Sequence, residues 1–366
     1  MNKLANRLAQ ASQEMTDEEP RTPRLALLVV LIIAAVAILF QWKGRQFRWE
    51  VFVAALVNVD PVWYTCALLL LALTYFGRAL RWRVMMLPIC PNASLKRIFI
   101  STVVGFSAIV LLGRAGEGVR PYLIAKAEQV SVASQLATWV LERIYDLLFV
   151  VLIFGVSLTQ INTSNVSAGP ALTWMLQTGG WIMGAIGVVC TGVLVAVGSF
   201  SEFARGRIVE GLRVVPDKYR TKIESVLLAF VGGMESTRSR SFVLQLIALT
   251  AVEWMLIVLT NYCLFQSIDQ TRRLSLVENM IFLGFIAFGS VVQIPGIGGG
   301  MQVASVLVLT ELFGLQFEAA TGISLLIWLT NSVAVMPFGL VLGIAQGINW
   351  RSLKAIEAQS DSGIGT

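Results

Sequence analysis

Long apolar runs constrain this chain more than any other feature of its sequence. A transmembrane helix needs about 20 predominantly apolar residues, and several runs here approach or exceed that length. Apolar residues make up 56% and charged residues 14% of the 366 positions, so no segment is left over for a soluble domain. We expect about six full spans, at residues 25–40, 62–80, 133–158, 172–197, 242–265 and 319–346. The sequence therefore predicts an all-α, polytopic membrane helix bundle.

The residues that are absent or scattered exclude several classes of protein. Histidine is absent, which excludes His-based metal sites, catalytic triads and proton relays. The four cysteines are scattered without a C-x-x-C pair, so we expect inert packing residues. A formal charge of +6 would suggest nucleic acid in a soluble chain, but here the basic residues flank apolar runs and act as topology signals. We expect no nucleic-acid partner, no metal and no cofactor.

One apolar run, residues 99–112, is too short to cross a membrane. Its 14 residues would form a helix about 21 Å long, against a hydrocarbon core of about 30 Å. The segment that follows reads Gly113-Arg114-Ala115-Gly116-Glu117-Gly118-Val119-Arg120-Pro121. Backbone that leaves a helix at membrane depth must be buried in protein or line a wet cavity, because lipid cannot satisfy its polar groups. Gly113, Gly116 and Pro121 are the predicted break residues.

The distribution of basic residues indicates that this segment returns to the side from which it came. If residues 99–112 crossed fully, the connection 201–241, with its eight basic residues, would lie outside, against the positive-inside rule. A second break, with Pro295, Gly296 and Gly298, must likewise begin and end on the outer side. The two arms of this segment, 276–313, are either half-helices or full crossings, since both satisfy the charge distribution. Two hairpins of opposite orientation are the signature of inverted repeats around a midplane site. The alternative is that the glycines merely allow close helix packing.

Charged residues inside the predicted membrane region form the candidate site. They are Arg114, Glu117, Arg120, Glu142, Arg143, Asp146 and Glu253. In a helix Glu142 and Asp146 share a face at i,i+4, and Arg143 reaches Asp146 at i,i+3. We hypothesise that Arg114 and Arg120 release carboxylate partners to bind an anionic headgroup, since a guanidinium suits a phosphate. Alternatively, these charges only hold the bundle together.

Three further positions carry more open interpretations. Glu253 is either a pairing partner for an arginine or the group that titrates, should protons drive a transport cycle. Gln302, just past the second break, is a candidate donor to a phosphate or a sugar hydroxyl. The group Arg78, Arg81, Trp82 and Arg83 closes the run 62–80. We expect these residues to anchor the helix at the cytoplasmic interface, with substrate binding as the alternative.

The remaining segments define the organisation of the chain. We expect a cytoplasmic tail at 1–24, a transmembrane domain at 25–350 and a cytoplasmic tail at 351–366, in the cytoplasmic (inner) membrane of a prokaryote. Between the fourth and fifth spans, 201–241 is predicted to be a cytoplasmic connection that contains an amphipathic helix. That helix could pack on the bundle or dock a partner enzyme, and the chain could form a homo-oligomer.

Three motifs carry a resemblance to a known family. They are Gly113-Arg114-x-Gly116-Glu117-x-x-Arg120-Pro121-Tyr122-Leu123, Glu142-Arg143-x-x-Asp146 and Ile294-Pro295-Gly296. In these motifs the chain resembles the flippase-like membrane family that includes the transmembrane region of lysylphosphatidylglycerol synthases. The resemblance implies movement of lipids, or of lipid-linked sugars, between leaflets. Synthase activity is not implied, because synthase members carry a large soluble transferase domain after the membrane part. Met301 and Gln302 stand where the family has a basic and an acidic residue.

The sequence thus favours a transporter for an anionic phospholipid or a lipid-linked substrate such as a polyprenyl-phosphate or a glycolipid. A first alternative is a membrane-embedded transferase, for which Glu117 or Glu253 would supply a general base. A second alternative is an accessory scaffold that recruits a soluble enzyme through residues 201–241. We expect no enzymatic activity and therefore no catalytic residue.

Overall fold

The computed structural model describes residues 47–159, 185, 187–190, 192, 240–290, 293–294 and 298–345. The chain divides into two units, Met1–Trp49 and Glu50–Thr366, and the account below concerns the second. Several predicted segments lie outside the described residues: both tails, the span at 25–40, most of the span at 172–197 and nearly all of the connection 201–241.

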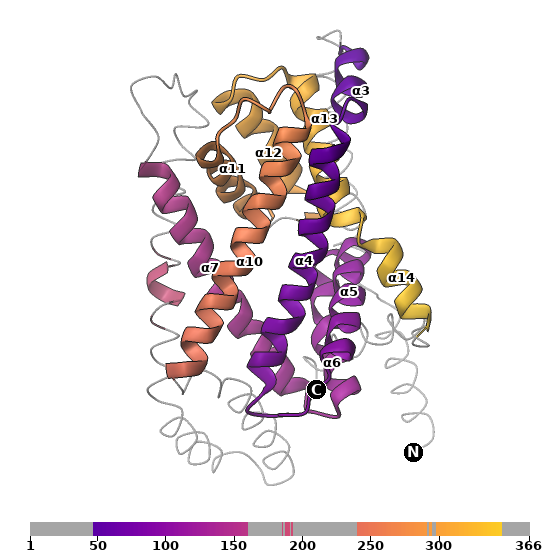
Figure 1. Ribbon diagram of the computed structural model, residues 1–366, viewed down its shortest axis with the longest axis vertical. Coiled ribbons are helices and arrows are strands. Elements are labelled where there is room, and N and C mark those ends of the chain that lie inside the picture. The colour runs from indigo at the N-terminus through magenta and orange to yellow at the C-terminus, as the bar shows by residue number, and fades with distance from the viewer. Residues whose placement is uncertain are drawn as a thin grey trace, which may run out of the picture. The chain divides into compact units, whose positions relative to one another are not determined.

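Two long helices, α4 (Pro61–Met86) and α10 (Arg240–Ser267), pack side by side along the bundle (Figure 1). They are antiparallel, because the Asp60 amide at the start of α4 donates to the Ser267 carbonyl at the end of α10 over 2.8 Å. Asp60 also caps α4, since its Oδ1 accepts from the amides of Val62 and Trp63 at 3.0 and 3.3 Å. At 26 and 28 residues, either helix is long enough to cross a bilayer. A short helix, α3 (Trp49–Val57), precedes α4.

The first hairpin consists of α5 (Leu95–Leu112), the 3₁₀ turn η1 (Gly113–Gly118) and α6 (Val119–Glu128). Together α5 to α6 span 34 residues that are apolar enough for one crossing, but the chain folds back at η1. A Cβ on Gly105 would lie 2.5 Å from the Arg120 Cβ, whereas a straight helix would separate these residues by about 22 Å. Gly113 has a φ of 63°, a conformation that favours glycine.

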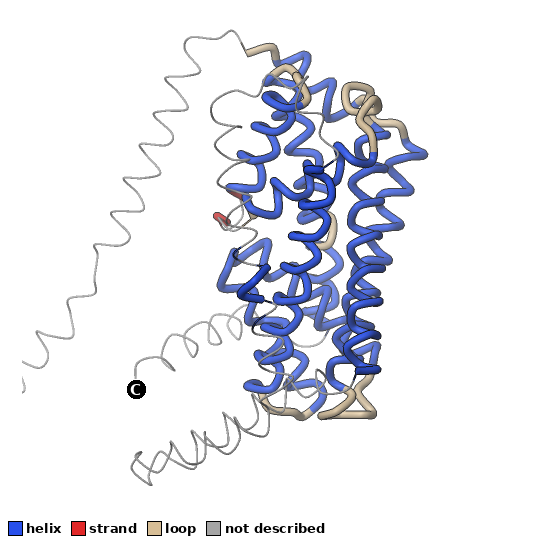
Figure 2. Tube along the Cα trace, turned by 90° about the vertical axis from the view of Figure 1, so that its left-hand side faces the viewer, coloured by secondary structure: helices blue, strands red, loops and turns tan. Residues whose placement is uncertain are grey.

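The second hairpin consists of α11 (Leu276–Gly289), the strand pair β1 (Gln293–Ile294) and β2 (Gly298–Gly299), and α12 (Gly300–Leu307), which continues as the π-helix η4 (Val308–Leu312). Figure 2 shows the strand pair in red. Its arms are 14 residues and 13 residues (eight plus five) long, or about 20 Å each, which is too short to cross. The segment therefore folds back on itself as a hairpin of two short arms.

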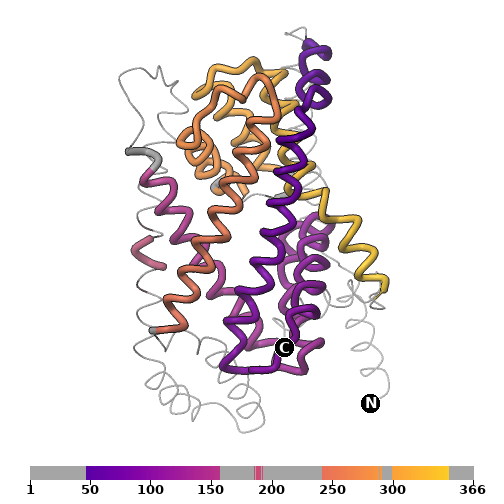
Figure 3. The backbone as a smooth tube through the Cα atoms, in the orientation of Figure 1, coloured from indigo at the N-terminus to yellow at the C-terminus, as the bar shows by residue number. Residues whose placement is uncertain are grey.

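The two hairpins occupy opposite ends of the α4–α10 pair. In Figures 1 and 3 α5 and α6 lie in the lower half, and α11 and α12 lie in the upper half. Their tips meet, because η1 contacts β1 and the Arg114 Nη2 donates to the Ser290 carbonyl at 3.1 Å. This arrangement confirms the predicted pair of oppositely oriented hairpins.

Three helices complete the described bundle. The predicted span 133–158 is α7 (Val132–Thr159), which follows α6. The last span is broken into α13 (Phe317–Trp328), the π-helix η5 (Leu329–Val333) and α14 (Met336–Ala345). The π-helix precedes Pro337, which is the second residue of α14. Helix α14 packs on α5 where Gly339 meets Ser107. Residues 122–128 belong to α6, the second arm of the first hairpin, and pack against the bundle.

The surface of the described bundle is apolar over much of its length. By length and composition four of its helical segments could cross a membrane, counting the folded-back Leu95–Glu128 among them. Leu69, Val303 and Ile344 are 62%, 70% and 74% exposed, which suits contact with lipid. The protein is therefore an all-α membrane helix bundle, as its sequence predicts.

Candidate functional site

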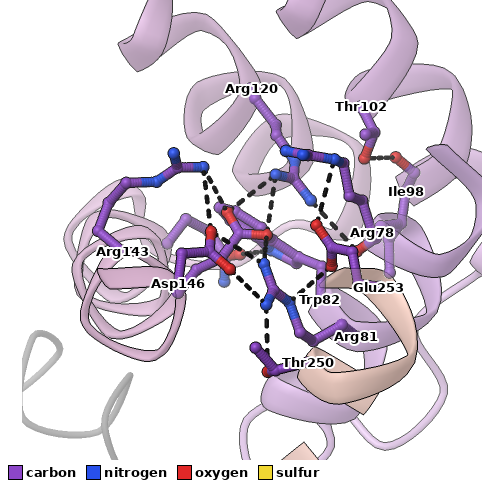
Figure 4. Close-up of polar contacts among 12 residues, drawn as sticks. Arg78, Arg81, Trp82, Ile98, Thr102, Arg120, Arg143, Asp146, Thr250 and Glu253 are labelled. Atoms are coloured by element: carbon purple, nitrogen blue, oxygen red, sulfur yellow. Dashed lines mark hydrogen bonds and ion pairs between the residues drawn. The ribbon is translucent and has the colours of Figure 1, made fainter. Parts of the chain in front are cut away.

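Arg81 of α4 is the centre of a buried charge network (Figure 4). Its side chain is 1% exposed. Its Nη2 lies 3.0 Å from the Glu142 Oε1, and its Nη1 lies 2.7 Å from the Asp146 Oδ1, so it binds both carboxylates on one face of α7. The same Nη1 donates to the Thr250 Oγ1 of α10 at 3.1 Å. One guanidinium therefore joins three helices.

Glu253 contributes the third carboxylate and comes from α10. Its Oε1 lies 3.2 Å from the Arg78 Nε, and its Oε2 lies 3.2 Å from the Arg81 Nε. Neither Glu253 carboxylate oxygen has a hydrogen-bond partner among the described residues, so these contacts are ion pairs only. Glu253 is 1% exposed, so its negative charge is compensated almost entirely by the two arginines of α4. Glu253 is thus a pairing partner for arginine; whether it also titrates stays a prediction.

Arg120 of α6 brings the first hairpin into the network. Its Nη1 donates to both Glu142 carboxylate oxygens, at 2.9 and 3.1 Å, and its Nη2 donates to the Arg78 carbonyl at 3.3 Å. The guanidinium carbon also lies 4.1 Å from the centre of the Trp82 ring, in a cation–π contact. With a side chain 4% exposed, Arg120 is held by a carboxylate on one side and an aromatic face on the other.

Arg143 is the most loosely held cation of the network. Its Nη2 lies 3.4 Å from the Glu142 Oε2 and 3.8 Å from the Asp146 Oδ2, both long for charged pairs. Its side chain is 39% exposed. Its Nε is buried and makes no hydrogen bond among the described residues. Arg143 is therefore the arginine of the network with the longest ion-pair contacts and the largest exposed fraction.

The network carries an excess of positive charge. Four arginines, 78, 81, 120 and 143, face three carboxylates, 142, 146 and 253. Among the described residues this leaves one positive charge without a matching negative one. Because an uncompensated charge in a low-dielectric interior is costly, such a site favours an anionic ligand.

Arg114 and Glu117 lie at the tip of the first hairpin and pair with each other, and Glu117 also interacts electrostatically with Arg143. The Arg114 Nη1 lies 2.8 Å from the Glu117 Oε1, and the Arg114 side chain is 52% exposed. Its Nη2 donates to the Ser290 carbonyl, just past the end of α11. Arg114 and Arg120, predicted to act together on one headgroup, thus have different partners and different burial.

The predicted residues of the second hairpin that the structure describes, Gln302 and Gly298, make contacts within the hairpin itself. The Gln302 Oε1 accepts from the Gly299 amide at 2.7 Å and so caps the start of α12. Gly298 lies in β2, opposite Ile294. Pro295 and Gly296 lie outside the described residues. Gln302 has a structural contact here, and its predicted role as a donor to substrate stays a prediction.

The interpretation of the α4 cluster as an interfacial anchor was wrong. Arg81 and Trp82 are buried, 1% and 0% exposed, and the Trp82 Nε1 donates to the Gln135 Oε1 at 2.9 Å. An arginine that snorkels extends its side chain from the end of an apolar helix to the interface, but α4 continues past Arg81 through the apolar residues 84–86. The sequence around Arg81 contains no local signal of its burial, because its partners lie on α7 and α10.

Comparison with known proteins completes the description of the site. Residues 25–339 match the family model described as the lysylphosphatidylglycerol synthase transmembrane region. No curated protein and no solved structure matches the chain. Within the part of the chain that the structure describes, no group of three or more Asp, Glu or Cys side chains is placed to hold a metal ion.

Proposed function

The chain belongs to the lysylphosphatidylglycerol synthase transmembrane-region family, and from this premise we propose that it moves a lipid with an anionic phosphate headgroup between the two leaflets. Membership makes it a membrane protein of lipid metabolism or transport. The substrate is an anionic phospholipid, or a sugar linked to lipid through phosphate, such as a polyprenyl-phosphate. The lipid crosses without covalent change.

The observation that supports this proposal most is the excess guanidinium at Arg143. A phosphodiester carries one negative charge, which matches the one unbalanced positive charge among the described network residues. A planar guanidinium binds two phosphate oxygens at once, and such charge-assisted hydrogen bonds are about twice as strong as neutral ones. Arg143 is also the arginine of the network with the largest exposed fraction, 39%.

The network supplies two arrangements, and among the described residues only the one with bound phosphate is charge-balanced. Without substrate, Glu142 holds Arg143 only weakly, at 3.4 Å, while binding Arg81 and Arg120 more closely. With substrate, the phosphate binds the Arg143 guanidinium, and Glu142 stays paired with Arg81 and Arg120. The acyl chains stay in the lipid, so only the headgroup enters the protein.

The transferase alternative lacks comparable support. A general base must be free to accept a proton, whereas both carboxylates considered for that role are ion-paired, Glu117 with Arg114 and Glu253 with Arg78 and Arg81. The scaffold alternative depends on residues 201–241, which lie almost wholly outside the described residues. It predicts that a partner enzyme is retained only when this connection is intact.

The orientation of the protein follows from charge. We place the basic connection and both termini in the cytoplasm of a prokaryote, so that the α4–α5 end of the bundle faces inward. Proton coupling through Glu253 predicts that an imposed pH gradient changes the rate of lipid movement. A rate that ignores the gradient would exclude such coupling.

Reconstitution tests the proposal directly. Proteoliposomes contain phosphatidylglycerol labelled on an acyl chain with a dithionite-reducible fluorophore, and external dithionite reports how fast inner-leaflet lipid becomes accessible. We expect the wild-type protein to accelerate this step and Arg143→Gln to slow it about tenfold or more, since about 1.5–3 kcal/mol of charged hydrogen bonding is lost. Arg143→Lys keeps the positive charge but loses the planar pair of donors, so we expect its rate of lipid movement to lie between those of the wild type and Arg143→Gln.

Arg272→Gln is the matched control. Arg272 is 46% exposed and ion-paired with Asp60 at 3.3 Å, so it resembles Arg143 in exposure but has no contact with the network. Size-exclusion profiles establish that each variant is folded. Equal lipid movement by wild type, Arg143→Gln and Arg120→Ala would overturn the headgroup role.

A further inference from the structure

A second polar cluster lies in the half of the bundle that holds the second hairpin. It comprises Tyr64 of α4, Asn261 of α10, and Thr330 and Asn331 of η5. The Tyr64 hydroxyl lies 3.1 Å from the Thr330 Oγ1, and the Asn331 Nδ2 lies 3.5 Å from the Asn261 Oδ1. Asn261 is 3% exposed and Thr330 is 1% exposed. The uncharged cluster, as we call these four residues, contains no ionisable acid or base near neutral pH.

Asn331 supplies the spare hydrogen-bonding capacity of the uncharged cluster, whereas the Asn261 Nδ2 donates to the Ile257 carbonyl at 3.0 Å and the Thr330 hydroxyl donates to the Leu326 carbonyl at 2.8 Å. A 3.5 Å amide contact is at the limit of a hydrogen bond, so Asn261 and Asn331 hold each other weakly. Asn331 makes no other side-chain hydrogen bond among the described residues, and it is only half-buried. It also lies in a π-helix, a deviation that is frequent at functional sites.

Two unsatisfied groups lie beside the uncharged cluster along α10. The Trp254 Nε1 is buried and has no hydrogen-bond partner in the described part of the protein. Asn279 of α11 is 0% exposed, and its Nδ2 donates to the Val258 carbonyl at 2.9 Å while its Oδ1 is left unpartnered. Val258 lies one helical turn from both Trp254 and Asn261. A buried donor and a buried acceptor thus lie along α10 between the charge network and the uncharged cluster.

Helix α10 connects the uncharged cluster to the charge network. Thr250, Trp254 and Asn261 follow one another at intervals of four and seven residues, which places them on one face of the helix. Thr250 receives a hydrogen bond from Arg81, and Asn261 receives one from Asn331. The two sites are therefore separated by eleven residues of one helix face, or about 16 Å.

We propose that the uncharged cluster is a second headgroup site, which binds the neutral, hydroxyl-bearing part of the lipid headgroup, a glycerol or a sugar. This inference rests on the proposed function. Amides and hydroxyls both donate and accept, as the hydroxyl groups of a polyol do, whereas a phosphate would meet no cation among these four residues. The headgroup is thus passed from a site that binds its charge to a site that binds its hydroxyls.

A comparison of two lipids tests the assignment. Phosphatidylglycerol and phosphatidic acid, each labelled on an acyl chain, share the phosphate but differ in the glycerol hydroxyls. In the dithionite assay we expect Asn331→Leu to slow movement of phosphatidylglycerol about tenfold and that of phosphatidic acid less than about twofold, because only the glycerol loses hydrogen-bond partners.

Thr260→Val serves as the matched control. Thr260 is a buried polar residue of α10, next to Asn261 in the sequence, but its hydroxyl donates to the Leu256 carbonyl within α10 at 2.7 Å. We expect this variant to move both lipids as the wild type does. Asn331→Ser, which keeps a donor and an acceptor, should restore part of the phosphatidylglycerol rate.

The outcomes separate the two proposals. If wild type moves both lipids and Asn331→Leu slows both equally, or slows neither, the second site is wrong and the proposed function stands. If the wild type moves neither lipid, both proposals fall. Selective loss of phosphatidylglycerol movement in Asn331→Leu alone supports the second site.

Discussion

The first hairpin, α5–η1–α6, and the second, α11–β1–β2–α12, share one construction and differ in charge. In both, two short arms fold back on each other where a glycine allows close approach: Gly105 against Arg120 in the first, Gly289 against Gly300 in the second. The first hairpin carries Arg114, Glu117 and Arg120, whereas residues 279–310 of the second contain no charged side chain. The charged residues of the second hairpin, Glu278 and Glu311, lie at its far ends, so its folded-back part contains no charge.

The difference in charge between the two hairpins indicates whether the charge network is needed for folding. If the network existed only to hold a hairpin in place, the second hairpin would need an equivalent. Instead it is held by apolar packing, for example Phe265 and Phe282 with ring centres 4.9 Å apart. Buried ion pairs are weak contributors to stability compared with well-packed apolar residues. We therefore relate the charges of the first half to the proposed anionic ligand rather than to folding alone.

The largest expected effect comes from removing the centre of the network. Arg81→Met would leave Glu142, Asp146 and Glu253 short of positive charge in a buried site. We expect a loss of about 3–5 kcal/mol in the free energy of unfolding, seen as a fall on the order of 5–10 °C in the apparent Tm by size exclusion after heating.

A surface ion pair provides the contrast. Arg272→Met breaks an exposed pair with Asp60, which we expect to cost less than about 1 kcal/mol. Comparable Tm changes in the Arg81 and Arg272 variants would show that the network does not depend on Arg81.

A medium effect is expected from adding one methyl group at the close contact of either hairpin. In Gly105→Ala the new Cβ would lie 2.5 Å from the Arg120 Cβ, and in Gly289→Ala it would lie 2.8 Å from the Ala304 Cβ. We expect each to destabilise the protein by about 1–3 kcal/mol. Only Gly105→Ala should also slow lipid movement, because only it displaces a residue of the network.

Gly77→Ala is the control for both glycines, since a Cβ there would meet nothing within 4 Å. It should leave the Tm unchanged or raise it, because alanine is favoured over glycine within a helix. If Gly289→Ala slowed lipid movement as much as Gly105→Ala at equal stability, the functional difference between the hairpins would be lost.

The smallest effect is expected in the uncharged cluster. Tyr64→Phe removes one neutral hydrogen bond, to Thr330, whose hydroxyl keeps its bond to the Leu326 carbonyl at 2.8 Å. We expect a loss of about 0.5–1.5 kcal/mol, measured by the same thermal assay. A loss as large as that in Arg81→Met would mean that the two halves are equally dependent on their polar clusters.

Much of the fold could be predicted from the sequence because it depends on length and charge. The short run at 99–112, the glycines after it and the positive-inside rule were enough to predict a hairpin, and Gly113 indeed turns with a positive φ. The helix spacing of Glu142, Arg143 and Asp146 likewise predicted the contacts within α7. These are local properties, which one stretch of sequence contains in full.

The centre of the network could not be predicted in the same way. An arginine near the end of an apolar helix can snorkel to the interface or be buried with a carboxylate, and the partner decides which. For Arg81 those partners lie 61 to 172 residues away, on α7 and α10. The uncharged cluster gave no signal at all, because asparagine, threonine and tyrosine are ordinary in membrane helices.

The side-by-side packing of α4 and α10 has a mechanical consequence. Both helices contribute to both clusters: Arg81 of α4 pairs with Glu253 of α10 in the charge network, and Tyr64 of α4 and Asn261 of α10 contact Thr330 and Asn331 in the uncharged cluster. A tilt of one helix against the other would therefore change the side-chain contacts of both clusters at once.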